Sequence, residues 1–299
     1  MRLMRRSLGT VSLLLLLTAA SVAQLGNVPP TAPATRVVAV LSAMTVEIET
    51  LGQELTDKKE LIVQGIQFTT GSLNERKVVL AHSGMGKVNA AMAATLLIEH
   101  FQPTHILFTG IAGGLNPELQ PGDVVIGAKT AYHDYGKWTP AGFRVGQTTD
   151  PFTGQPNPVF FPADAALLEM ANEAAPHLDL APVNTASGER MPRVVRGVIV
   201  TGDAFVASPA KKNTLREEFK ADATEMEGAA VAQVCWQRRV PCLILRSLSD
   251  DAGAEASEDV RLFEKRAAQN AARLVIGIVG RLESALSAPR DVSDRPRAP

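Results

Sequence analysis

The sequence predicts an α/β fold with three layers, in which helices cover both faces of a central mixed, mostly parallel sheet. Apolar runs typical of strands alternate along the chain with apolar residues at helical spacing, and this alternation favours a largely parallel sheet. Aromatic residues make up only 5% of the chain although hydrophobic residues make up 45%. A core rich in Ala, Val and Leu suits helices packed on such a sheet.

The elements are expected in a regular order, because strands and helices leave different apolar periodicities. A glycine-rich turn is expected at 110–114, directly after the strand at 105–109. Residues 136–160 are expected to form a long polar loop, and loops of that length are often functional. Strands are expected at 36–41, 105–109, 122–129, 194–202, 224–226 and 242–249, with one hairpin in 61–82 that turns at 73–76. Helices are expected at 45–55, 86–101, 163–175, 210–219, 227–238 and 258–286.

The first 23 residues have the pattern of a secretory signal peptide. Arg2, Arg5 and Arg6 form a basic start, residues 11–20 are apolar and include five consecutive leucines, and Ser-Val-Ala at 21–23 offers small residues for cleavage. The apolar run is shorter than the roughly 20 residues that span a bilayer. We therefore expect a periplasmic or secreted protein, with an uncleaved membrane anchor as the alternative.

The remaining chain is expected to hold one domain, at 36–286, between a Pro-rich linker at 24–35 and a disordered tail at 287–299. Signal cleavage removes three arginines and no acids, so the formal charge moves from -1 to about -4. This balance excludes a basic footprint for nucleic acid or anionic membranes. Cys235 and Cys242 fall in apolar patterns and are expected to be buried thiols, although a single bridge is open to them in an oxidising compartment.

Three acidic residues stand at the ends of predicted strands, where α/β sheets bind their ligands. Glu47 follows the first strand, Glu227 opens a helix after a short strand, and Asp250 ends an apolar strand. Each alone is explained by the favourable position of an acid at a helix N-terminus. Three at separate strand ends of one sheet indicate a shared site. The glycine-rich segments 82–91 and 109–115 match neither the dinucleotide fingerprint nor the phosphate-binding P-loop.

Six segments between residues 36 and 280 form a specific combination. They read VVAVLSAMTVEIETL, SGMGKVNAAMAATLLIEHFQPTHILFTGIAGGL, GDVVIGAKTAYHD, GVIVTGDAF, TEMEGAAVAQVCWQRRVPCLILRSLSD and FEKRAAQNAARLV. In order and spacing they resemble the 5′-methylthioadenosine/S-adenosylhomocysteine nucleosidases of the purine nucleoside phosphorylase and hydrolase superfamily. The resemblance implies a nucleoside phosphorylase-like fold, a homodimer, no cofactor, and hydrolysis of the N-glycosidic bond of a purine nucleoside with release of adenine.

The resemblance also implies a role for individual residues. Glu47 matches the general base that activates the attacking water, Asp250 matches the acid that protonates purine N7, and Glu227 matches the carboxylate that grips the sugar hydroxyls. The other implied site residues are Met226 beside the ribose, Ser249 supporting Asp250, Phe205 beside the base, Arg246 near the water and ribose, Ser83 near the ribose, and Met44 and Met85 on the 5′ side.

These roles fit the chemistry of the bond. The leaving purine needs a proton at N7, so one acid must have a raised pKa, while the ribose builds positive charge that a carboxylate stabilises. No metal is needed, and the sequence has no compact His/Cys cluster to hold one.

Three alternative functions are open on the sequence. A phosphorylase would use phosphate, for which Lys87 is a candidate ligand, but the turns at 84–87 and 110–113 contain no arginine and so favour water. A futalosine-type hydrolase is the second, and a non-catalytic periplasmic nucleoside-binding protein is the third. Ile111 in place of a serine puts one polar contact of the family pattern in question. Val260, where family members often have a phenylalanine, and a long segment at 135–162 leave the 5′ substituent open.

Overall fold

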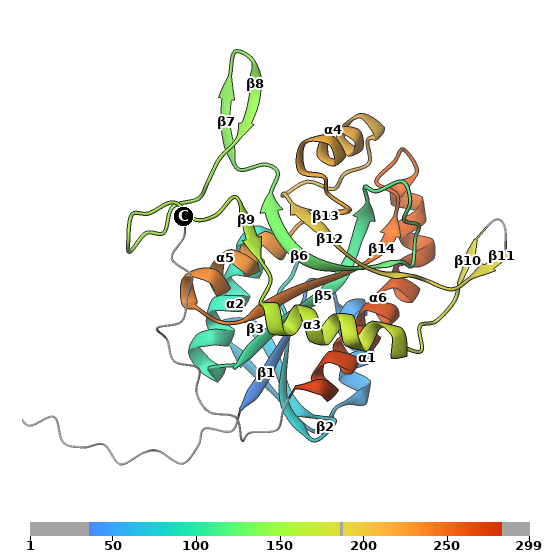
Figure 1. Ribbon diagram of the computed structural model, residues 1–299. Helices are drawn as coiled ribbons and strands as arrows, with labels where there is room; N and C mark the ends of the chain where they lie inside the picture. The colour runs from blue at the N-terminus through green and yellow to red at the C-terminus, as the bar shows by residue number, and fades with distance from the viewer. Residues whose placement is uncertain (1–35, 186–187, 283–299) are drawn as a thin grey trace, which may run out of the picture. The chain divides into compact units, whose positions relative to one another are not determined.

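A computed structural model describes residues 36–185 and 188–282, which are the coloured parts of Figure 1. The predicted signal peptide, linker and tail lie outside these residues. The described chain forms a large mixed sheet between two helical layers, so the predicted three-layer α/β fold is confirmed. Among the helices that the structure describes, none is long and apolar enough to cross a membrane.

The large sheet contains ten strands, most of them near the ranges that the sequence predicts. They are β1 (Val37–Ser42), β2 (Thr56–Val63), β3 (Ile66–Leu73), β4 (Arg76–His82), β5 (His105–Gly114), β6 (Val124–Tyr132), β9 (Phe160–Pro162), β12 (Val194–Thr201), β13 (Ala223–Glu225) and β14 (Cys242–Asp250). The helices are α1 (Thr45–Glu54), α2 (Lys87–Phe101), α3 (Ala165–Ala174), α4 (Pro209–Phe219), α5 (Gly228–Arg238) and α6 (Ala256–Arg281), with a 3-10 turn at Ala175–His177.

The strands lie in the order β13-β12-β6-β14-β5-β1-β4-β3-β2. The neighbours from β14 to β4 run parallel, as do β6, β12 and β13, whereas β14 and β6 are antiparallel. Strand β13 also pairs with the end of β5, where Thr224 lies opposite Gly113, so this part of the sheet closes on itself. The other end stays open at β2, whose first five residues are exposed.

Both faces of the central strands are buried, which explains their nearly continuous apolar sequences. In β1, Val38 and Val40 pack with α1, α3 and α6, whereas Ala39 and Leu41 pack with α2 and α5. Helix α2 faces the sheet with alanines and Leu97, and such small side chains let a helix lie close to the strands. The two layers hold the strand ends, and therefore the loops beyond them, in fixed positions.

The sequence prediction of a glycine-rich turn at 110–114 is wrong. These residues continue β5, which pairs with β14 from Ile106 to Gly113, with a register shift between Leu248 and Asp250. Glycine is a poor strand former and weakens the interior of a strand, so the sequence pattern predicts that the strand ends before Gly110. In the structure, glycines at these positions leave space for side chains that approach the strand.

The prediction of one hairpin in 61–82 was also incomplete. The structure contains two consecutive hairpins there, with two-residue turns at Gln64–Gly65 and Asn74–Glu75, and all four turn residues have positive φ angles. Such turns match the twist of paired strands.

Two further hairpins stand away from the sheet in Figure 1. One, β7 (Gly136–Thr139) with β8 (Gly142–Val145), occupies the predicted long loop, and the other joins β10 (Val183–Thr185) to β11 (Gly188–Arg190).

Candidate active site

The residues predicted to form a site gather at one end of the sheet. Glu47 lies in the first turn of α1, Glu227 is the N-cap residue of α5, and Asp250 is the last residue of β14. All three residues are at least 95% buried. Glu47 and Glu227 lie close enough to interact through their charges, whereas Asp250 lies further along β5, against Gly113. Acids are rarely buried without a function, so all three are candidates for the chemistry of this site.

The Glu47 carboxylate is held by backbone N–H groups. Its Oε2 atom accepts hydrogen bonds from the backbone N–H groups of Ala43 and Met44, each with a length of 2.8 Å. Its Oε1 atom accepts a hydrogen bond of 3.0 Å from the backbone N–H group of Ile111. Burial raises the pKa of Glu47, while Arg246 and the backbone donors oppose this shift. Because Ile111 contributes its backbone N–H, the side chain at this position does not affect the contact.

Two glycines of β5 make room for two of the acids. A Cβ atom at Gly110 would lie 2.7 Å from Oε1 of Glu47, and one at Gly113 would lie 2.9 Å from Oδ1 of Asp250. Real Cβ atoms do not approach other atoms so closely. The glycines in this stretch therefore serve to admit carboxyl groups against the sheet, which the sequence pattern alone did not reveal.

Arg246 lies at the centre of the acids and is fully buried. Its Nη2 atom is 2.6 Å from Oε2 of Glu225 and 3.9 Å from Oε2 of Glu227, and its guanidinium group stacks 4.2 Å from the centre of the Phe108 ring. Glu225 Oε2 also accepts hydrogen bonds from the backbone N–H groups of Glu227 and Gly228. Glu225 thus joins the arginine to the start of α5 and fixes the position of Glu227.

Glu227 reaches across to the β4–α2 turn. Its Oε1 atom accepts a hydrogen bond of 2.8 Å from the backbone N–H of Gly86. Gly86 has a φ of 91°, a backbone conformation that favours glycine. Burial, followed by repulsion from Glu225, raises the pKa of Glu227 to about 7, although Arg246 lowers it. This carboxyl group changes its charge close to neutral pH.

Asp250 is positioned by its own strand end. Its Oδ2 atom accepts a hydrogen bond of 2.7 Å from the Ser249 hydroxyl, and its Oδ1 atom accepts one of 2.8 Å from the backbone N–H of Ala252. Burial raises its pKa, while the two hydrogen bonds oppose the rise. A small cavity opens beside Asp250, and its lining includes Phe205, Met226, Thr224 and Val206.

The remaining predicted residues surround these acids. Met44 precedes α1 as its N-cap residue, and Met85 lies exposed in the β4–α2 turn next to Gly86. Ser83 is buried, and its hydroxyl donates to the backbone carbonyl groups of Ser42 and Gly84. Nine of the ten predicted residues come from loops, helix starts and strand ends at this one end of the sheet, and the tenth, Arg246, comes from the middle of β14.

Lys87 is held between two aspartates. Its Nζ atom lies 2.7 Å from Asp134 and 3.6 Å from Asp203, and Asp203 also accepts a hydrogen bond from the Lys87 backbone N–H. The backbone N–H of Asp203 donates in turn to Asp134. This ion-pair cluster links the β4–α2 turn, the end of β6 and the segment that carries Phe205.

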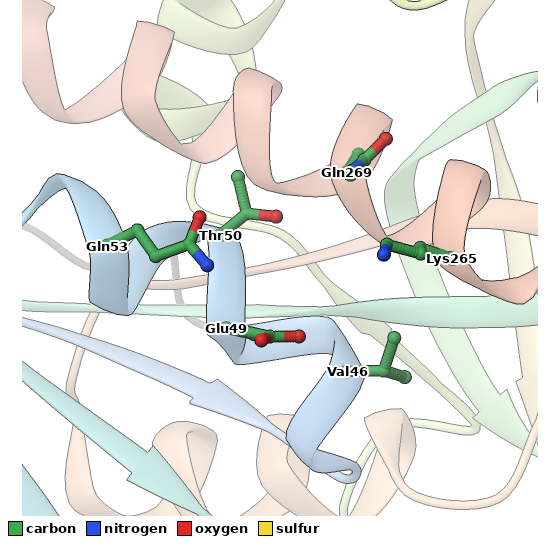
Figure 2. Close-up of a pocket in the computed structure, with 6 residues that line it drawn as sticks. All are labelled: Val46, Glu49, Thr50, Gln53, Lys265 and Gln269. Carbon is green, nitrogen blue, oxygen red and sulfur yellow. The ribbon is translucent and has the colours of Figure 1, made fainter.

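A separate hollow lies between α1 and α6, as Figure 2 shows. None of the predicted site residues lines it. Its walls are polar and come from the outer sides of the two helices, with Val46, Glu49, Thr50, Gln53, Lys265 and Gln269 as lining residues. Across the described ranges, no three His, Cys, Asp or Glu side chains are grouped so as to hold a metal ion.

Sequence reasoning missed several residues of the site. Glu225 stands at a strand end as the other acids do, so the rule that found Glu227 could have found it. Gly110 and Gly113 were noticed as glycines but placed in a turn. The partners of Lys87 gave no sequence signal, because Asp134 and Asp203 lie 47 and 116 positions away in the chain.

The three-layer fold and the buried acids at one end of the sheet define an α/β protein with a carboxyl-lined site. The family model described as the phosphorylase superfamily matches residues 37–280, and the chain belongs to this superfamily. Within it the chain belongs to the 5′-methylthioadenosine/S-adenosylhomocysteine nucleosidase family, as the sequence predicted. The nucleosidase of Mycobacterium bovis is 39% identical over 245 residues, which cover 81% of this chain and 96% of the relative.

Solved structures agree with this placement. The nucleosidase of Neisseria meningitidis in complex with methylthio-immucillin-A is 38% identical, with a TM-score of 0.73, and the match covers 83% of this chain and 100% of that one. The futalosine hydrolase of Helicobacter pylori is 31% identical, with a TM-score of 0.71 and coverage of 83% and 99%.

Proposed function

We propose that the chain hydrolyses the N-glycosidic bond of purine nucleosides of the 5′-methylthioadenosine and S-adenosylhomocysteine type, releasing adenine and the ribosyl product. The observation that carries this proposal is the cluster of Glu47, Glu227 and Asp250, three buried carboxyl groups with raised pKa values at one end of one sheet. The names of the relatives that match most of the chain support the substrate class.

The three acids divide the work of the reaction. Asp250 gives its proton to N7 of the purine, so the electron pair of the breaking bond leaves on a neutral base. Glu227 holds the sugar hydroxyls and stabilises the positive charge that develops on the ribose. Glu47 takes a proton from the water whose oxygen bonds to the anomeric carbon. Burial raises the pKa of Asp250, which favours the protonated form that this step requires, and Arg246 lies beside both Glu47 and Glu227.

Water is favoured over phosphate as the nucleophile. Lys87, the candidate phosphate ligand, is occupied by Asp134 and Asp203, and the other central cation, Arg246, is paired with Glu225. A phosphate dianion would also approach several carboxylates. The rate of base release should be the same with and without phosphate, and a ribose-1-phosphate product would contradict hydrolysis.

Two methionines, which the family resemblance assigns to the 5′ side, support a thioether substituent. Met44 and Met85 flank the turns on this side, and soft, flexible methionines pack well against alkyl and sulfur groups. We expect kcat/KM for methylthioadenosine to exceed that for adenosine by roughly 10–100-fold, the range that one small apolar group gives. Futalosine belongs in the same substrate panel, because a futalosine hydrolase is among the similar structures.

The decisive assay follows free base by chromatography after incubation of the pure protein with each nucleoside. Asp250→Asn and Glu227→Gln should each lose most turnover while they keep the fold, as judged by circular dichroism. If the wild-type protein binds a nucleoside but releases no base from any member of the panel, the chain is a binding protein and the proposal is wrong.

We also propose that two copies of the chain associate through the start of α2. Val88 is 79% exposed and Met92, one helical turn further along, is 45% exposed. Met85, also exposed, precedes them in the chain, and the exposed Tyr135 follows Asp134, which forms an ion pair with Lys87 at the start of the same helix. Exposed apolar groups that cluster indicate an association surface.

Light scattering on a sizing column tests the dimer. The wild type should elute as a dimer, and Val88→Asp should shift it to a monomer. Ile62→Asp is the matched control, because Ile62 is equally exposed, at 76%, but lies on β2. A monomeric wild type would contradict the proposal.

Export is proposed on the sequence of residues 1–23 alone. Fractionation of expressing cells, with the N-terminus of the recovered protein determined by mass spectrometry, should place a chain that starts near residue 24 outside the cytoplasm. Recovery of the full-length chain from the cytoplasm would contradict export.

A further inference from the structure

The two cysteines of the chain lie side by side in the core. Cys235 is in the last turns of α5 and Cys242 is the first residue of β14, and both are buried. The side chain of Cys242 is close enough to raise the pKa of Cys235. The backbone N–H of Val240 donates a hydrogen bond of 2.9 Å to the carbonyl oxygen of Cys235. This bond closes the turn between α5 and β14, so the strand begins beside the end of the helix.

The elements that carry these thiols also carry the acids of the site. Helix α5 begins after Glu227 and contains Cys235 near its other end, and β14 begins at Cys242 and ends at Asp250. The helix and the strand run in opposite directions, so the acids lie at one end of the pair and the thiols at the other. The cysteine contact is therefore the base of the helix–strand unit that holds the site.

We propose that Cys235 and Cys242 are a disulfide-forming pair, which closes when the chain folds in an oxidising milieu. The thiols are neighbours within the same core cluster, and the intervening chain makes a short, ordered turn. This inference does not rest on the proposed reaction, since neither sulfur belongs to the carboxyl cluster. An exported chain would meet such a milieu, where disulfides form and persist.

The step is a thiol–disulfide exchange with a small disulfide such as oxidised glutathione. One cysteine thiolate attacks a sulfur of the glutathione disulfide, and one glutathione leaves as a thiolate. The second cysteine then attacks the mixed disulfide and displaces the second glutathione. The two cysteines lose two electrons and two protons, and two molecules of reduced glutathione carry them away.

The pair is expected to close during folding and not afterwards. Contact with Cys242 and burial raise the pKa of Cys235 well above its usual range, so the folded protein holds it as a thiol. A thiol is a poor nucleophile, and the core excludes glutathione. In the unfolded chain both thiols are free to react. A protein folded under reducing conditions should therefore resist oxidation, whereas one refolded with oxidised glutathione should acquire the bridge.

The bridge would stabilise the fold without changing the reaction. Along β14 the eight steps from Cys242 to Asp250 span about 26 Å, so the sulfurs lie far from the chemistry. A bridge restricts the unfolded chain, and the short loop between the cysteines limits the gain. We expect Tm to rise by roughly 3–8 °C on oxidation, with kcat/KM unchanged.

The test refolds the reduced, full-length chain from urea with reduced and oxidised glutathione. Denaturation and alkylation with N-ethylmaleimide follow, and the intact mass is measured. The proposal expects no alkylation and a mass lower by two hydrogens than that of the reduced chain. Two alkylated cysteines, a glutathione adduct or a disulfide between two chains would each overturn it.

Matched variants separate the bridge from packing changes. Cys235→Ala and Cys242→Ala each remove one sulfur from the core, so their Tm under reducing conditions reports packing alone. Their Tm should not respond to the oxidant, whereas that of the wild type should. A wild-type Tm that is the same in the oxidised and reduced preparations would contradict the expected stabilisation, and the mass measurement stands even if a variant fails to fold.

Discussion

The Glu227 carboxylate ends 3.9 Å from the guanidinium group of Arg246, although the same guanidinium lies only 2.6 Å from Glu225. The arginine is therefore shared unequally, and Glu225 takes the closer position. Glu227 is left as a buried carboxylate with incomplete compensation of its charge, next to a second carboxylate. Burial, followed by repulsion from Glu225, raises the pKa of Glu227 to about 7, and the more distant guanidinium group offsets this rise only in part.

The first prediction concerns the pH dependence of activity. Glu227 stabilises a developing cation only when it is ionised, so kcat/KM should fall as the pH drops through about 7. This acid limb of the pH profile of kcat/KM should be absent in Glu227→Gln, whose residual rate should stay constant around pH 7. A wild-type rate that stays constant from pH 8 to pH 5 would contradict the role of this carboxylate.

The second prediction concerns stability. Because the pKa of Glu227 is about 7 in the folded protein and its ordinary value is 4.5, the folded state keeps a proton that the unfolded chain releases between these values. Stability therefore falls as the pH rises from about 4.5 to 7, by an amount on the order of 3 kcal/mol. Glu227→Gln should raise Tm at pH 8 and make little difference at pH 4.5. A lower Tm of the variant at pH 8 would show that the carboxylate is stabilising instead.

The third prediction concerns the space that Gly110 leaves for Glu47. Gly110→Ala would place a methyl group 2.7 Å from Oε1 of Glu47, so the carboxylate must move away from the backbone of Ile111. We expect kcat to fall by about 10²-fold or more, as when a catalytic group is misplaced. The control is Gly52→Ala in α1, because a Cβ atom there meets nothing within 4 Å. Equal activity of the two variants would contradict the argument.

The fourth prediction separates Ser249 from Asp250. The Ser249 hydroxyl lowers the pKa of Asp250 against the rise that burial causes. Ser249→Ala should therefore raise this pKa further and shift the alkaline limb of kcat, which reports the loss of the Asp250 proton, to higher pH. Ser247→Ala is the matched control on the same strand, since its hydroxyl donates to Gly122 instead. An alkaline limb at the same pH in both variants would remove Asp250 as the source of the proton.

Much of the fold could be predicted because its signals are local. Strands β1 and β14 are buried on both faces, so most of their residues are apolar. Helix α2 is buried on one face, so its apolar residues recur at helical spacing. In both cases burial selects the residue types directly, and the sequence shows the pattern. The acids of the site were found because the ends of parallel strands meet at one edge, so Glu47, Glu227 and Asp250 could be grouped without coordinates. Their individual roles came from the family resemblance.

What escaped prediction depends on contacts between distant residues. The glycines of β5 predict the end of a strand because glycine has a low strand propensity. The structural need for them comes from Glu47 and Asp250, whose carboxyl groups approach from other parts of the chain. The partners of Lys87 and the unequal sharing of Arg246 are likewise products of the tertiary structure. Periodicity in the sequence contains no information about such pairs.

The open edge that β2 forms in the described sheet has a consequence for how copies of the chain behave at high concentration. Strand β2 carries Asp57, Lys58, Lys59 and Glu60 in its exposed part. A strand from another molecule could extend the ladder here only by dehydrating these charges, which is unfavourable. Fibril-like growth through β2 is therefore opposed by the side chains of the strand itself, and concentrated protein should resist aggregation by this route.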